Sequence, residues 1–180
     1  MEYFNELAAK YPLRPYSENE FGEQFILQKE TQNFVITHFD EETGSDGIKI
    51  YLDIASVIMD YIESNDLLNQ YVSLVKIQEA GEDYLVIPYH PGKLFSSLSK
   101  IERWDDEDKP DELVLMREAV TRVCENWNSP KEKIIAEILK ADLLGPTFNT
   151  YFDEHIEKFI ITEPGIKPEH LQLWATTMES

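Results

Sequence analysis

The chain has 180 residues, 42% of them hydrophobic and 12% aromatic, which is enough for one folded domain with a packed core. It carries 35 acidic residues against 16 lysines and arginines, and the resulting net charge of −19 is spread along the whole sequence. This charge excludes nucleic acid and anionic membranes from the expected partners, because both attract proteins through lysine and arginine.

The first elements along the chain are predicted to be a short helix and a hairpin. Residues 2–10 form the expected helix, which ends before a pair of prolines. Two runs rich in β-branched and aromatic residues follow, 21–29 and 33–39, and the short polar stretch between them indicates a hairpin connection.

A helix and a second pair of strands are predicted next. Apolar residues recur at helical spacing over 51–63, which favours an amphipathic helix. Residues 72–77 and 84–89 resemble strands, and the turn-forming sequence at 80–83 predicts that they pair as a second hairpin.

The second half of the chain is predicted to be helical. A charged loop, residues 104–111, separates a strand-rich part (1–103) from a helical part (112–180) within a single domain spanning 1–180. Apolar spacing predicts helices over residues 113–127, 130–144, 148–160 and 168–178. Ser129, Pro130 and Glu132 have the pattern of a helix start with a capping box.

These elements together predict an α+β fold. We expect a small antiparallel sheet of about four strands with a packed helix, followed by a C-terminal part of three to four helices.

No complete catalytic or cofactor-binding motif is present. Glycine-rich phosphate loops, the HExxH zinc pattern and the GxSxG nucleophile elbow are all absent from the sequence. The single cysteine, Cys124, lies among apolar residues and is predicted to be buried rather than nucleophilic. We therefore predict no catalytic residue, no cofactor and no metal site.

Two acidic segments are the predicted contact surface for a partner. A tryptophan beside carboxylates can receive arginine or lysine through ion pairs and cation–π contacts, and loops carry binding residues disproportionately. The predicted contact residues are Glu41, Glu42 and Asp46 in one segment and Trp104, Asp105, Asp106, Glu107 and Asp108 in the other. Whether the two segments lie on one side of the molecule is left open by the sequence.

The favoured functional hypothesis is a non-enzymatic binding protein that inhibits a basic partner. An immunity protein that neutralises a bacterial toxin, such as a nuclease with a basic cleft, has this size and charge. The lone cysteine, and an N-terminus without a signal peptide, predict a cytoplasmic location.

Three alternatives remain open. The acidity can serve solubility alone, or the C-terminal helices can belong to a structural or scaffold subunit. The chain can also be a small cytosolic enzyme with a dispersed site, for which His38, Asp40 and His90 are the first candidates.

Overall fold

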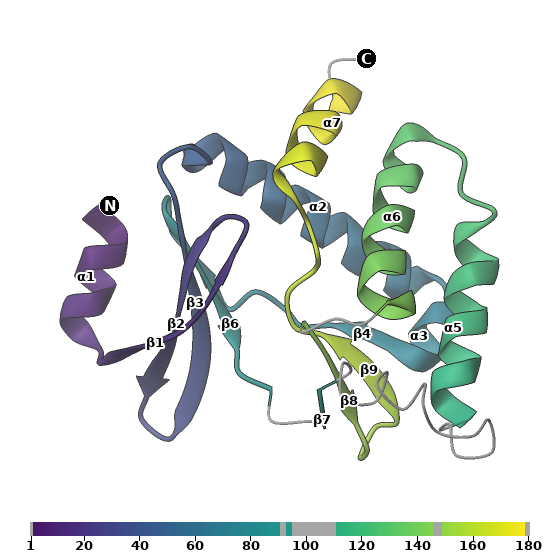
Figure 1. The fold of residues 1–180 in the computed structure, drawn as a ribbon, viewed down its shortest axis with the longest axis horizontal. Coiled ribbons are helices and arrows are strands. Elements are labelled where there is room, and N and C mark those ends of the chain that lie inside the picture. Colours follow the sequence, from purple (N-terminus) through teal and green to yellow (C-terminus); the bar gives the residue numbers. More distant parts are fainter. Residues whose placement is uncertain (1, 91–92, 95–110, 146–148, 179–180) are drawn as a thin grey trace.

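The computed structural model describes residues 2–90, 93–94, 111–145 and 149–178, and they form an α+β fold with two sheets (Figure 1). The larger sheet has five antiparallel strands in the order β1-β2-β3-β6-β5. Its strands are β1 (Leu13–Asn19), β2 (Gly22–Lys29), β3 (Gln32–Phe39), β6 (Tyr84–Pro88) and β5 (Glu79–Ala80).

The larger sheet confirms the predicted strands at 21–29 and 33–39 and adds β1, which the sequence had not indicated. β1 lies at the edge of the sheet with most of its residues exposed, so it lacks the alternation of a half-buried strand. It also contains Pro15, a residue that sheets accept at an edge strand or at a bulge, and the register of β1 shifts immediately after it.

A second, smaller sheet has the order β4-β9-β8-β7. Its strands are β4 (Val72–Leu74), β9 (Lys158–Ile161), β8 (Thr150–Asp153) and β7 (Lys93–Leu94). β4 runs parallel to β9, and the other pairs are antiparallel.

Two predictions made from the sequence are wrong in this region. The segment predicted as a helix over 148–160 contains the β8–β9 hairpin, whose turn includes Glu157 at φ 54°. The run 72–77 does not pair with 84–89, because β4 joins the second sheet and the short strand β5 is the hairpin partner of β6. The first error comes from short apolar runs, which fit a strand or a buried helix equally well. The second is an error of pairing, because residues 72–74 do form a strand, but its partner is distant in the chain.

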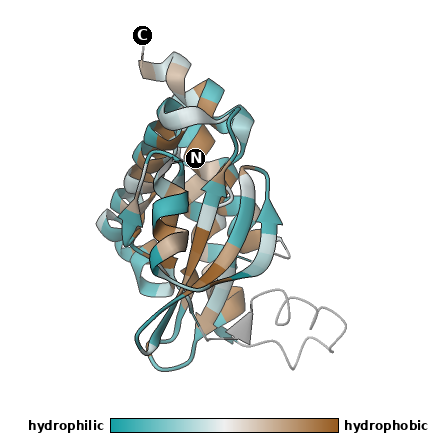
Figure 2. Ribbon diagram, turned by 90° about the vertical axis from the view of Figure 1, so that its left-hand side faces the viewer, coloured by the Kyte–Doolittle hydropathy of each residue, from teal (hydrophilic) through white to brown (hydrophobic). Residues whose placement is uncertain are grey.

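The helices cover the sheets from several sides (Figure 1). They are α1 (Glu2–Lys10), α2 (Gly44–Ser64), α3 (Asp66–Tyr71), α5 (Asp111–Cys124), α6 (Pro130–Leu144) and α7 (Pro168–Met178). Figure 2 is viewed from the side of α1 and shows hydrophobic positions in the strands and helices behind it, with hydrophilic positions in the turns.

Helix α2 confirms the helix predicted at 51–63 and begins earlier, at Gly44. Ile48, Ile54, Ile58 and Ile62 are all buried in the main core, which they share with α5, α6 and the second sheet. α2 therefore spans the molecule between the larger sheet and the helical part, and its other residues are available to line a space beside the larger sheet.

The predicted starts of α6 and α7 are also confirmed. Ser129 and Glu132 form the expected capping box at the start of α6, and α7 has the predicted bounds. Within the described part of the chain, none of the helices combines the length and the apolarity needed to cross a membrane.

Candidate ligand-binding cleft

The segment that follows β9 brings a carboxylate between the two sheets. The backbone N–H and the hydroxyl of Thr162 both donate to the carbonyl oxygen of Asn149, each at 2.8 Å, which fixes the chain as it leaves β9. Glu163 comes next, followed by Pro164 and Gly165, and its side chain reaches the larger sheet.

Two amides from the larger sheet hold the Glu163 carboxylate. Asn19 Nδ2 donates to Oε1 at 2.5 Å, and Gln24 Nε2 donates to Oε2 at 2.6 Å. The same Gln24 nitrogen lies 3.1 Å from the hydroxyl of Thr37. Because Gln24 and Thr37 are both buried in the larger sheet, these bonds fix the carboxylate against two strands.

The β1–β2 turn positions Asn19 for this contact. Its Oδ1 accepts hydrogen bonds from the backbone N–H groups of Phe21 and Gly22, at 2.9 and 3.1 Å. Gly22 has φ 147°, and a Cβ at this position would lie 2.1 Å from the carbonyl oxygen of His38. The turn therefore needs glycine here, and it leaves the Asn19 amide free to donate to Glu163.

Three acidic groups from different elements share this enclosure. Burial raises the pKa of Glu163 against the opposing effect of its bonds from Gln24 and Asn19. Burial also raises the pKa of Asp142, on α6, to about 7, even though the Gly165 N–H donates to Asp142 Oδ2 at 2.8 Å. Burial, with the negative charges of Glu163 and Asp142, raises the pKa of Tyr51 on α2.

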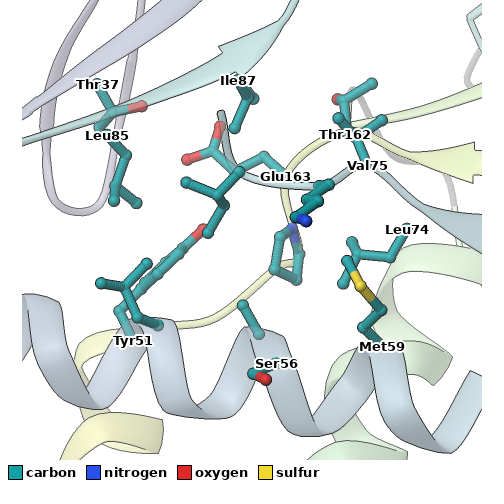
Figure 3. Close-up of a pocket in the computed structure, with 15 residues that line it drawn as sticks. Thr37, Tyr51, Ser56, Met59, Leu74, Val75, Leu85, Ile87, Thr162 and Glu163 are labelled. Atoms are coloured by element: carbon teal, nitrogen blue, oxygen red, sulfur yellow. The ribbon is translucent and has the colours of Figure 1, made fainter. Parts of the chain in front are cut away.

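A cavity of about 230 Å³ lies beside Glu163, between α2 and the two sheets. Figure 3 shows Tyr51 and Met59 extending from α2, with the Tyr51 hydroxyl directed to the side of the cavity where the Glu163 carboxylate lies. The described residues that line it are mostly apolar: Leu52, Ala55, Met59, Leu74, Val75, Ile77, Leu85, Ile87 and Pro164, with Thr37, Tyr51, Ser56, Lys76, Thr162 and Glu163 as the polar ones.

Glu163 also lines two flanking cavities. One, of about 280 Å³, includes Asn19, Asp142, Asn149 and Lys167 among its lining residues. The other, of about 80 Å³, includes Tyr16, Gln24, Tyr89, His90 and Tyr151. Glu163 thus lines all three of these cavities, and we take it as the central residue of a candidate site.

The residues predicted for a dispersed enzyme site are not brought together. His38 pairs with Tyr84 at the start of β6, and its ring stacks on Phe4 of α1 at 4.1 Å. His90 follows the other end of β6, where Nε2 lies 3.4 Å from a carboxylate oxygen of Asp153. Asp40 accepts hydrogen bonds from the backbone N–H and the hydroxyl of Thr43, both at 2.9 Å, and so fixes the turn before α2.

The predicted partner surface is described only in part. Glu41 and Glu42 are exposed in the turn before α2, and Asp46 lies in the first turn of that helix, 2.9 Å from Lys49 Nζ. The other predicted segment, Trp104 to Asp108, lies outside the described residues. Contact of this surface with a partner stays a prediction.

Two further side-chain findings bear on chemistry. Cys124 is buried as predicted, and burial raises the pKa of its thiol to about 11. Among the residues that the structure describes, no three His, Cys, Asp or Glu side chains are grouped so that they could hold a metal ion.

Sequence reasoning missed Glu163 because its partners are distant in the chain. Asn19 lies 144 residues away and Gln24 lies 139 residues away, so no local motif records the cluster. The available signal was an acid two residues after the apolar run 159–161, since functional side chains often lie at strand ends.

Comparison with known proteins finds similarity in solved structures alone. No protein-family model and no curated protein matches the chain. The kinase PK-1 of Cydia pomonella granulovirus is similar over 89% of this chain and 53% of its own, with 14% identity and a TM-score of 0.45. The macrolide 2'-phosphotransferase MphH of Brachybacterium faecium is similar over 99% and 82%, with 10% identity and a TM-score of 0.41. The chain thus spans about half the length of the granulovirus kinase.

These neighbours contradict the functional predictions from sequence. One is a kinase and the other a phosphotransferase, so the predictions of a non-enzymatic protein and of a toxin-neutralising immunity protein are wrong. Those predictions depended on the net charge and on the absence of motifs, and neither of these indicates which fold the chain adopts. At this level of similarity, the activities of the two neighbours are not carried over to this chain.

Proposed function

We propose that this chain binds a small organic molecule in the cavity between α2 and the two sheets, with Glu163 as its polar anchor. The observation that supports this proposal is an apolar space of about 230 Å³ with a carboxylate at its wall, held by amide donors from two positions of the larger sheet. Apolar walls with a few convergent polar groups are the usual composition of a small-molecule site.

The volume indicates the size of the ligand. An engineered protein cavity of about 150 Å³ binds benzene. The cavity beside Glu163, at about 230 Å³, is larger and therefore suits a bicyclic ring system. Ala55, Met59 and Leu85 supply the apolar contact surface for such a ring.

The electrostatics of the site favour binding over a purely structural role. Burial disfavours the charged forms of Glu163 and Asp142, so both carboxyl groups lower the free energy of unfolding at neutral pH. A core selected for stability alone would hold amides or apolar side chains at these positions. Carboxyl groups with raised pKa values beside a cavity are typical of functional sites.

The test is a thermal-shift screen of bicyclic aromatic compounds against the wild type and Ala55→Leu. Ala55 is buried in the cavity wall, so a leucine there adds three carbon atoms to the space that the ligand would occupy. Compounds that raise the melting temperature of the wild type should lose that effect in the variant.

Ala9→Leu, at an exposed position of α1, is the matched control and should respond like the wild type. Equal responses of Ala55→Leu and the wild type to the same compounds would place their binding elsewhere and refute the proposal.

Two predictions from the sequence accompany this proposal. A cytoplasmic location rests on the lone cysteine. A basic protein partner for the surface around Glu41 and Glu42 rests on the net charge of −19.

A further inference from the structure

Glu163 and the hydroxyl groups beside it supply the cavity with hydrogen-bond acceptors. Among the described residues, Asn19 donates one hydrogen bond to one oxygen of Glu163 and Gln24 donates one to the other. A carboxylate has about four lone-pair sites, so Glu163 retains the capacity to accept from a ligand. The hydroxyls of Thr37 and Tyr51 also line the cavity and can accept as well as donate.

In the described part of the chain, Glu163 has no cationic partner of its own. The bonds that favour its ionised form come from the neutral amides of Gln24 and Asn19. Lys76 lines the main cavity and Lys167 lines a flanking one, but neither forms an ion pair with Glu163 or Asp142 in the described structure. A buried carboxylate is stabilised strongly when a cation is placed beside it.

The surroundings of the cavity also favour positive charge. Asp142 on α6 adds a second carboxyl group to the enclosure, and it interacts with Glu163. The protein as a whole carries a net charge of −19, which attracts cations and repels anions as they approach.

We infer that the ligand of the cavity is an organic cation, a bicyclic compound with an aromatic ring and an aliphatic amine whose ammonium group lies against Glu163. The ring occupies the apolar space lined by Ala55, Met59 and Leu85, and the ammonium N–H groups donate to the free lone pairs of the carboxylate. This inference rests on the proposed function and specifies the charge of the ligand.

Three probes that share one ring system test which ligand charge the cavity prefers. They are 2-aminoindane, 2-indanol and indane-2-carboxylate, which are a cation, a neutral molecule and an anion at neutral pH. Isothermal titration calorimetry on the full chain should give an affinity for the amine about tenfold or more above that for the alcohol, because a charge-assisted hydrogen bond replaces a neutral one. The carboxylate should bind more weakly than either.

Glu163→Gln keeps the shape of the side chain and removes its charge. In this variant the amine should lose its advantage over the alcohol, while the affinity for the alcohol changes by less than about threefold. Glu18→Gln, at an exposed position of β1, alters the net charge of the protein equally and should keep the advantage. Ala55→Leu should lose affinity for both probes.

The outcomes separate this inference from the proposed function. An alcohol that binds the wild type as tightly as the amine, with binding lost in Ala55→Leu, overturns the inference and leaves the cavity function standing. Failure of all three probes to bind the wild type overturns both. The comparison within the wild type decides the question of charge even if Glu163→Gln does not fold.

Discussion

The two faces of the larger sheet are built from the same strands and differ in chemistry. On the face toward α1, Leu27, Ile36 and Val86 pack with Leu7 in a small apolar core. On the face toward α2, the alternate positions place Gln24, Thr37 and Leu85 toward Glu163 or its cavity. The α1 face therefore contributes to stability, whereas the α2 face combines buried polar groups with unfilled space, which is the composition of a site.

Ile36→Ala should have the largest effect on stability. The side chain is completely buried on the α1 face, and its truncation leaves a cavity that costs about 2–5 kcal/mol of unfolding free energy. Urea denaturation measures the loss, and Val114→Ala on the exposed surface of α5 is the control, with an expected change within about 0.5 kcal/mol.

Binding of the cavity ligand should persist in Ile36→Ala. At a temperature where Ile36→Ala is folded, it should bind the cavity ligand like the wild type, because Ile36 faces α1. Loss of binding in the folded variant would show that the two faces are not separable.

Stability should fall as the pH rises, because of the acids on the α2 side. The folded-state pKa of Asp142 is raised from 3.8 to about 7, so folding is favoured while the group is protonated in the folded chain. This contribution is complete below about pH 4 and is lost as the pH rises to about 7, with an upper limit of roughly 4 kcal/mol from the size of the shift. The raised pKa of Glu163 acts in the same direction.

Asp142→Asn should reduce this pH dependence. Its amide oxygen can still accept from the Gly165 N–H, and it has no charge to bury. Urea denaturation at pH 4.5 and pH 8 should show the variant gaining stability relative to the wild type at the higher pH. A difference between the two proteins that is constant with pH would mean that Asp142 does not titrate in this range.

The elements predicted well from the sequence carry their signal locally. The capping box of Ser129 and Glu132 determines where α6 begins, through bonds between residues three apart. Helix α2 is recognisable because its buried isoleucines recur at helical spacing over several turns.

The remaining features depend on contacts between distant residues. β4 is recognisable as a strand, but its parallel pairing with β9 joins Val72 to Phe159 across the helical part. The same limit applies to the site, because Glu163, Asn19 and Gln24 meet only after both sheets have formed. His38, Asp40 and His90, the candidates for a dispersed site, are not brought together, because His38 and His90 lie at opposite ends of β6 and Asp40 holds the turn before α2.

Thr37→Val should have the smallest effect on stability and a measurable effect on binding. Valine has nearly the shape of threonine, so the packing on β3 is retained while the hydroxyl next to Gln24 is lost. The Gln24 amide keeps its bond to Glu163, so the unfolding free energy should fall by about 1 kcal/mol, the usual net value of one hydrogen bond.

Val35→Thr makes the reverse change two residues earlier on the same strand face and should lower stability further, because it buries a new hydroxyl. Affinity for 2-aminoindane should fall severalfold in Thr37→Val if the orientation of Glu163 depends on the Gln24–Thr37 pair. An unchanged affinity at reduced stability would assign Thr37 to the structure of the sheet alone and confine the site to Glu163 and its two amides.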